Sequence, residues 1–507
     1  RPLCAQIYKP PSMLDYRTFL PKAGLTMPTC SSMSLLPLRL TSVLLLVSAA
    51  TGFEYHDEHE AVHATPLWRR SRDKYSAKKR YDQDSKDKDK ENELLMNIST
   101  TLEDMKTEYI GTIGVGTNAA GNGAQFEARV VFDTGSTNLW VASTLCKEFP
   151  CNTDRALEFY DPGKSLSQED FPGDNGDIDI MFGTGELIGP LHVDTYRVGP
   201  MVVKQQPFAM IREMNGDVFS SFPFEGILGL GFKSLSFGGI TPFFERVIEQ
   251  RLLTNNEFAF FLNVDSNEPS ALLWGGIDKD LYHGPIHMFP VVQAHYWSLE
   301  LLDFRLGNQS MAELGMSDQK VKRLIIDSGT TYFTAPEGLH DQIVSHIPEA
   351  SCDEVNDYPP LTYVLRGVDG QTYELIVSQE TYMIGGYGDN CRPAFMALDV
   401  NEEYGPAMIL GEVFMRHFFT VFSRGSGKVD DARVGFAPAK IGAIPKVRPM
   451  SKPSFLQTQD AWNAPSSRRA ATTNSTSVAI NSEASVSKRV SITAPASVPR
   501  LIRKHSA

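Results

Sequence analysis

Residues 130–137 read VVFDTGST, and residues 324–331 read LIIDSGTT. Each stretch is a short apolar run that ends in Asp-[Thr/Ser]-Gly-[Ser/Thr], a pattern that predicts a buried strand leading into a tight turn. Their aspartates, Asp133 and Asp327, are 194 residues apart, about the length of one domain. One such motif indicates only a turn, but two copies behind similar strands indicate a duplicated lobe.

A second element repeats in the same order along the chain. Residues 226–229 read GILG and follow the first motif, whereas residues 407–411 read AMILG and follow the second. Each half of the chain therefore combines an acidic glycine turn with a later Ile-Leu-Gly strand. This duplication at long period favours two similar lobes that face each other.

Two facing turns of this kind would bring the carboxyl groups of Asp133 and Asp327 within hydrogen-bond distance. Two carboxylates so close cannot both ionise easily, so they share one proton. One carboxylate can then act as a base on a water molecule, while the protonated partner polarises a peptide carbonyl. Asp133 and Asp327 are thus the candidate catalytic residues.

Six neighbouring residues are expected to support this pair. In each turn the glycine lets backbone N–H groups approach the carboxylate. The hydroxyl after the glycine can donate to the outer carboxylate oxygen, and the hydroxyl before it can reach the opposite loop. The supporting residues are Thr134, Gly135, Ser136, Ser328, Gly329 and Thr330.

Residues 107–440 predict an all-β body with a few short helices. Short β-branched and aromatic runs alternate there with clusters of Gly, Pro, Asn and Asp, which is typical of strands joined by turns. The best helical windows are Pro242–Arg251 and Glu337–His346. The expected lobes are an N-terminal one at 107–285 and a C-terminal one at 286–440.

The charge distribution argues against nucleic acid as a partner. The chain carries −13 in total, with +3 over residues 1–100 and +8 over residues 441–507, which leaves −24 for residues 101–440. An acidic body repels a polyanion. The six cysteines include no Cys-x-x-Cys and no His/Cys cluster with zinc spacing, so no zinc site is expected. Chemistry by two aspartates needs neither a metal nor an organic cofactor, and none is expected.

The two ends of the chain differ from the middle. Residues 33–50 resemble an export signal peptide, with an apolar run too short to span a bilayer, so no transmembrane anchor is expected. Residues 51–106 are predicted to be a basic prosegment, although a disordered linker is the alternative, since ten Lys and Arg lie within residues 69–90. Residues 441–507, rich in Ser, Ala, Thr, Pro and Arg, predict a disordered basic tail.

Over about residues 107–440 these motifs resemble the pepsin-like aspartic protease family, which implies a bilobal fold with a substrate cleft between the lobes. Residues 182–185, FGTG, resemble the flap hairpin that closes over substrate in that family. The resemblance gives Phe182, Gly183 and Thr184, together with Trp140, a role in binding the substrate. It also implies two disulfides, Cys146–Cys151 and Cys352–Cys391.

One position departs from the family pattern. The flap usually carries Tyr where this chain has Phe182, and that tyrosine hydroxyl normally bonds the tryptophan that corresponds to Trp140. Phe keeps the aromatic wall and lacks the hydroxyl. Phe in the flap, with charged extensions at both ends, resembles the apicomplexan plasmepsin IX/X group.

We therefore expect a monomeric aspartic endopeptidase that hydrolyses polypeptides with a water activated between the two aspartates. It is expected to be made as a secretory zymogen that is inhibited by its own prosegment, and to process other secretory proteins. Its expected location is the secretory pathway, where it is either secreted or held in a secretory or acidic organelle. The first alternative is a digestive endopeptidase of an acidic compartment. The second is a non-catalytic peptide-binding protein on the same fold, because fold alone does not fix function.

Overall fold

The repeated motifs fold as the same unit in both halves of the computed structural model. In each half, the strand that leads to the aspartate runs parallel to the Ile-Leu-Gly strand, which on its other side pairs antiparallel with the strand that follows the aspartate turn. The first unit consists of β3 (Phe126–Asp133), β4 (Leu139–Ala142) and β10 (Gly226–Gly229), and the second of β16 (Arg323–Ile326), β17 (Phe333–Ala335) and β24 (Met408–Leu410).

The structure describes residues 98–104, 108–152, 158–173, 176–182, 185–216, 219, 223–265, 267–314, 321–386, 389–445 and 489–493. Within these ranges strands predominate and helices are short, the longest being α3 (Glu337–His346) with 10 residues. The predicted all-β class with a few short helices is thus confirmed. The predicted signal peptide at 33–50 lies outside the described residues, as do most of the predicted prosegment and tail. No helix of the described part is long and apolar enough to cross a membrane.

The first lobe is built around long, strongly paired strands. Its 14-residue strand β7 pairs along one edge with β8 and, near its beginning, with β6 and β9. One short helix, α2 (Phe243–Glu249), buries two phenylalanines and a valine. The other strands of this lobe are β2 (Tyr109–Val115), β5 (Glu169–Asp170), β6 (Asp177–Phe182), β7 (Gly185–Val198), β8 (Met201–Ile211), β9 (Glu213–Asn215), β11 (Glu257–Phe261) and β12 (Ser270–Trp274).

The second lobe has its own sheet, in the order β23-β17-β24-β16-β14-β19-β20-β27. A small three-stranded sheet, β18-β22-β21, lies beside the disulfide of this lobe. The remaining elements are β14 (Ser298–Leu306), β15 (Gln309–Ser310), β18 (Ala350–Ser351), β19 (Leu361–Arg366), β20 (Thr372–Val377), α4 (Gln379–Tyr382), β21 (Met383–Gly385), β22 (Asn390–Pro393), β23 (Phe395–Ala397), α5 (Glu412–Met415) and β27 (Val490–Thr493).

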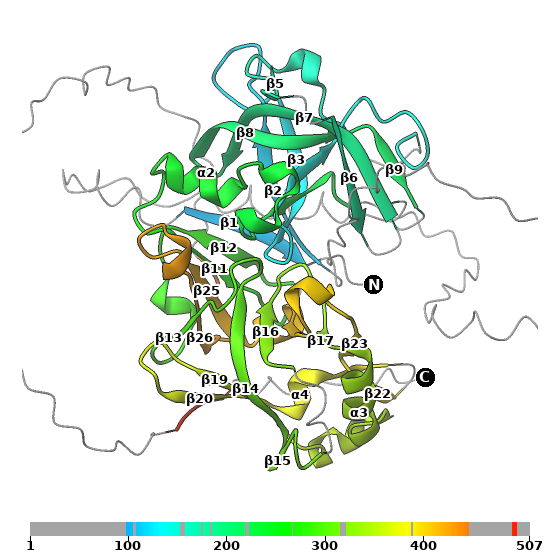
Figure 1. The fold of residues 1–507 in the computed structure, drawn as a ribbon, viewed down its shortest axis with the longest axis vertical. Coiled ribbons are helices and arrows are strands. Elements are labelled where there is room, and N and C mark those ends of the chain that lie inside the picture. The colour runs from blue at the N-terminus through cyan, green and yellow to red at the C-terminus, as the bar shows by residue number, and fades with distance from the viewer. Residues whose placement is uncertain are drawn as a thin grey trace, which may run out of the picture. The chain divides into compact units, whose positions relative to one another are not determined.

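A central antiparallel sheet joins the two lobes. Strand β11 of the first lobe pairs with β25 (Phe418–Ser423) of the second (Figure 1). Phe258 stacks on its register partner Phe422, with ring centroids 5.0 Å apart. Outside this pair the sheet continues to β12 and β1 (Ile98–Asp104) on one side, and to β26 (Arg433–Pro438) and β13 (His287–Pro290) on the other. The lobes are therefore connected by backbone hydrogen bonds as well as by the chain.

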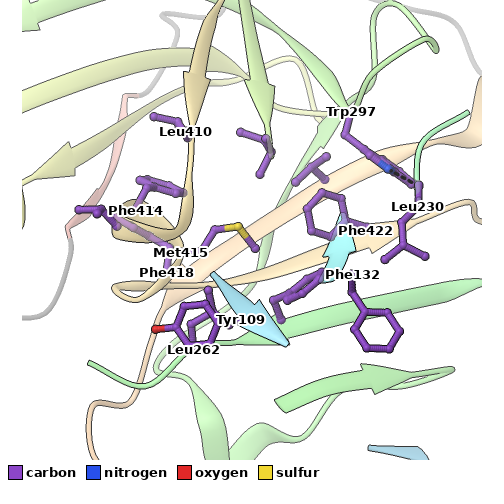
Figure 2. Close-up of a cluster of buried hydrophobic side chains, with 14 of the residues drawn as sticks. Tyr109, Phe132, Leu230, Leu262, Trp297, Leu410, Phe414, Met415, Phe418 and Phe422 are labelled. Atoms are coloured by element: carbon purple, nitrogen blue, oxygen red, sulfur yellow. Dashed lines mark hydrogen bonds between the residues drawn. The ribbon is translucent and has the colours of Figure 1, made fainter. Parts of the chain in front are cut away.

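The largest cluster of buried apolar side chains draws on both lobes. Figure 2 shows Phe132 and Leu230 of the first lobe beside Trp297 and Phe422 of the second. The Trp297 indole N–H donates to the Leu230 carbonyl at 3.0 Å. Because Phe132 precedes Asp133 directly, this core supports the turn that carries the first aspartate.

Two terminal segments differ from the sequence-based expectation. The tail was predicted to be disordered, but Val490–Thr493 form β27 at the edge of the second lobe's sheet, so that prediction is wrong for these residues. Their alternation of apolar and hydroxyl side chains fits a strand with one buried face. The predicted prosegment includes β1, which pairs with β12 and β2 in the central sheet.

Candidate active site

Asp133 and Asp327 lie together in the interior, where each side chain is at most 1% exposed. Their carboxyl groups interact, since the charge of Asp133 is one of the causes that raise the pKa of Asp327. Gly135 lies directly against the second of them, since a Cβ atom placed on this glycine would come within 2.4–2.5 Å of all three atoms of the Asp327 carboxyl group. The two turns, distant in sequence, thus meet at their acidic ends.

Each carboxyl group accepts the same two hydrogen bonds from its own turn. The glycine two residues later donates its N–H to Oδ1, and the hydroxyl three residues later donates to Oδ2. In the first turn the donors to Asp133 are the Gly135 amide at 2.9 Å and the Ser136 hydroxyl. In the second turn the donors to Asp327 are the Gly329 amide at 2.8 Å and the Thr330 hydroxyl at 2.6 Å.

The residues between each Asp and Gly lock the two loops to each other. The Thr134 amide donates to the Ser328 hydroxyl oxygen at 3.1 Å, and the Ser328 amide donates to the Thr134 hydroxyl oxygen at 2.9 Å. The Thr134 hydroxyl donates to the carbonyl of Ile326 at 3.0 Å, and the Ser328 hydroxyl donates to that of Phe132 at 2.7 Å. All four bonds cross between the lobes, so they fix the separation of the carboxyl groups.

Glycines of the Ile-Leu-Gly strands allow these loops to pack closely. A Cβ at Gly229 would lie 2.4 Å from the carbonyl carbon of Thr137, and a Cβ at Gly411 would lie 2.2 Å from the carbonyl oxygen of Thr330. Real Cβ atoms do not approach so closely to backbone, so any side chain at either position would push the aspartate loop away. The repeated glycine therefore belongs to the architecture of the site.

The electrostatics favour a proton on this pair. Burial and the neighbouring Asp133 charge raise the pKa of Asp327 well above its usual value, against the opposing effect of the hydrogen bonds from Thr330 and Gly329. A carboxyl group that stays protonated can donate a hydrogen bond, while an ionised partner can accept a proton from water. The arrangement can thus supply an acid and a base at one point.

The candidate flap is described only in part. Phe182 ends β6 opposite Gly185 of β7, which makes a hairpin, and the two residues between them, Gly183 and Thr184, lie outside the described residues. Trp140 lies in β4 opposite Ile227 of β10 and is 2% exposed. The part of these residues in substrate binding stays a prediction.

Four cysteines form two disulfides in the structure. Cys146 pairs with Cys151 in the first lobe, and Cys352 pairs with Cys391 in the second. Both disulfides match the pairing that the family resemblance implies. Among the described residues no group of three or more His, Cys, Asp or Glu could hold a metal ion.

Trp297 connects the two aspartate strands, and no sequence signal indicated it. Its carbonyl accepts the Ile326 amide at 3.1 Å, one residue before Asp327, while its indole reaches Leu230. The Leu230 amide in turn donates to the Asp133 carbonyl at 2.7 Å. This chain of contacts crosses between lobes through partners remote in sequence, so no local pattern could reveal it.

Comparisons with known proteins agree with this geometry. The family model for eukaryotic aspartyl proteases matches residues 108–439. Aspartic protease 3 of Toxoplasma gondii is 36% identical over 66% of this chain and 51% of its own length. Plasmepsin IX of Plasmodium falciparum is 30% identical over 67% of this chain and 61% of its own length. Pepsin A of Sus scrofa is 32% identical over 66% of this chain and 82% of its own length.

This chain thus spans between about half and three fifths of the length of the two apicomplexan relatives. The matched region contains both aspartate turns and both lobes. The chain therefore belongs to the eukaryotic aspartyl protease family.

Proposed function

We propose that the chain is an aspartic endopeptidase whose catalytic pair is Asp133 and Asp327. The observation that carries the proposal is the symmetric support of two buried, adjacent carboxyl groups. Each receives an amide and a hydroxyl from its own turn, and both turns are tied together by Thr134 and Ser328. Such duplicated positioning suits one reaction centre with two complementary carboxyl groups.

In this mechanism a water molecule lies between the two carboxyl groups. The ionised carboxylate takes a proton from the water as it attacks the peptide carbonyl carbon, and the protonated carboxyl donates to the carbonyl oxygen. A proton then passes to the leaving amine as the C–N bond breaks. Aspartic proteases are the standard example of two carboxyl groups that share a proton in this way, and the apparent pKa values belong to the pair.

The test is to replace each aspartate by alanine and measure hydrolysis of a peptide library at several pH values. Either Asp133→Ala or Asp327→Ala should lower turnover below about 1% of wild type, since groups that act as one unit fail together. The matched control is Asp170→Ala, which removes an aspartate whose side chain is 96% exposed and should keep full activity. Substantial activity in either dyad variant, with unchanged folding, would refute the mechanism.

We further propose that the enzyme is a secretory zymogen that processes other secretory proteins. Three features support this proposal: the ten Lys and Arg within residues 69–90 of the predicted prosegment, the predicted leader at 33–50, and the resemblance to the plasmepsin IX/X group. The alternative of general digestion gains support from the similarity to pepsin A. Cleavage-site profiling separates the two, because a processing enzyme should show a narrow motif and a digestive one a broad profile. A folded protein that binds peptides without cleaving any would instead indicate the non-catalytic alternative.

A further inference from the structure

The outer edge of the second lobe's sheet is occupied by a segment from the far end of the chain. Strand β27 pairs in parallel with β20, with Val490 opposite Tyr373 and Ile492 opposite Leu375 (Figure 1). Without β27, strand β20 would be the last strand of this sheet. Its unpaired N–H and C=O groups would then be open to any extended peptide.

The segment is held by side chains as well as by backbone. Ile492 is 4% exposed and belongs to the main core cluster, and Val490 packs against that cluster. Ser491 and Thr493 alternate with them and are exposed. The segment thus presents two β-branched residues to the core of the lobe, as a strand with one buried face should.

An ion pair between Arg489 and Glu374 holds the residue just before β27 beside β20. The Arg489 guanidinium lies 3.6 Å from Oε1 of Glu374, an oxygen that also accepts from Arg305 at 2.9 Å. Arg489 is largely exposed, so this pair contributes mainly to register rather than to affinity. Opposite charges of the tail and the body favour the encounter, since residues 441–507 carry +8 and residues 101–440 carry −24.

We propose that the edge of β20 is a peptide-binding site distinct from the catalytic pair, and that its resident ligand is the chain's own segment 489–493. Its ligand chemistry is an extended peptide with a basic residue followed by β-branched residues at alternate positions. Main-chain pairing supplies part of the affinity, and burial of Ile492 in the core cluster supplies the selectivity. The segment binds as a separable ligand in cis and leaves β20 exposed when it detaches.

The test uses the full chain with two matched substitutions. Ile492→Asp places a charge in the buried position, whereas Ser491→Asp places the same charge on the exposed face of the same strand. Hydrogen exchange of the β20 amides should become at least about tenfold faster in Ile492→Asp and stay at the wild-type rate in Ser491→Asp. Exchange in β3 and β16 should not change in either variant, which shows that the lobes remain folded.

A labelled peptide of residues 486–496, VSKRVSITAPA, then tests binding in trans. It should bind the Ile492→Asp chain and slow the exchange of β20, but not bind the wild-type chain at the same concentration, because a cis ligand has a high effective concentration. The same peptide with Ile492→Asp should not bind. If Ile492→Asp impairs folding, Ile492→Ser gives the milder test. Unchanged β20 exchange, or no binding of the peptide to the vacated edge, would overturn the proposal.

Discussion

A single missing side chain, at Gly135, allows the two aspartates to meet. Because a Cβ there would lie 2.4–2.5 Å from the Asp327 carboxyl group, Gly135→Ala must push that carboxyl aside. Displacing a catalytic group by about 1 Å can cost about a hundredfold in rate. We therefore expect kcat/KM of Gly135→Ala to fall at least about a hundredfold.

The matched control for this experiment is Gly163→Ala. A Cβ at Gly163 meets only an Asp161 oxygen at 3.4 Å, which is ordinary contact. This variant should keep wild-type activity. Full activity in Gly135→Ala would mean that the two carboxyl groups need not lie as close as they do here.

The raised pKa of Asp327 has a consequence for stability. Since its pKa in the folded protein lies above the usual value of 3.8, folding favours the protonated form. The stabilisation of the folded protein by this proton is complete below about pH 3.8, and it is lost as the pH rises through the folded-state pKa. Asparagine resembles the protonated carboxyl and does not ionise, so the Tm of Asp327→Asn relative to wild type should rise with pH.

Thermal unfolding of both proteins between about pH 4 and pH 7 measures this difference. The matched substitution Asp170→Asn, at an exposed position, corrects for the general effect of losing one negative charge. A Tm difference between Asp327→Asn and wild type that stays constant across this range would contradict the assigned direction of the pKa shift.

At the scale of elements, the two aspartate loops are coupled through Thr134 and Ser328. Thr134→Val removes the hydroxyl that donates to Ile326 and accepts from the Ser328 amide. Leaving buried partners unsatisfied should lower the free energy of unfolding by about 1–3 kcal/mol. Urea unfolding measures the loss, and Thr112→Val, on an exposed position of β2, is the control.

Ser328→Ala should cost a similar amount, and the double variant less than the sum, because both residues serve one set of cross-loop bonds. Strictly additive losses would show that the two hydroxyls act independently. Activity should fall together with stability, since the same bonds fix the distance between the carboxyl groups.

The elements that could be predicted from sequence are those with a local signal. Asp133 and Asp327 follow apolar strands and precede glycine turns, and the repeat of this pattern reveals the pair. The strand at Val490–Thr493 could not be predicted, because four residues in a polar tail carry too little periodicity to indicate a strand. The role of Trp297 could not be predicted for a related reason, since it depends on contacts with Leu230 and Ile326 that only the tertiary fold creates.

At the scale of the whole molecule, the site depends on how firmly the two lobes are joined. Besides the pairing of β11 with β25, the Arg424 side chain, 3% exposed, forms a 2.7 Å ion pair with Glu245 of α2. The guanidinium also lies over the Phe232 ring, 5.2 Å from its centroid. These contacts cross between lobes at some distance along the chain from the aspartate turns, so they hold the lobes in one arrangement around the catalytic pair.

The distribution of charge along the whole chain predicts how the enzyme is kept inactive. Ten Lys and Arg lie within residues 69–90, while residues 101–440 carry −24. Such a basic segment should bind the acidic body near neutral pH and weaken its hold as carboxylates are protonated in acid. We therefore expect the chain that begins at Thr51 to be inactive near neutral pH and to become active once residues 51–96 are removed.

The comparison is with a chain that begins at Asn97, which retains β1 and therefore the whole central sheet. This short form should be active without processing, and added peptide 69–90, whose ten Lys and Arg and five Asp give it a charge of +5, should inhibit it. Inhibition should weaken as salt rises, because pairing between exposed charges is screened within about 10 Å at 0.1 M ionic strength. A peptide of the same composition in scrambled order separates general charge attraction from a specific fit, since only the native order should inhibit fully if the segment occupies the catalytic pair. A long form as active as the short one would refute autoinhibition, and salt-insensitive inhibition would refute its electrostatic origin.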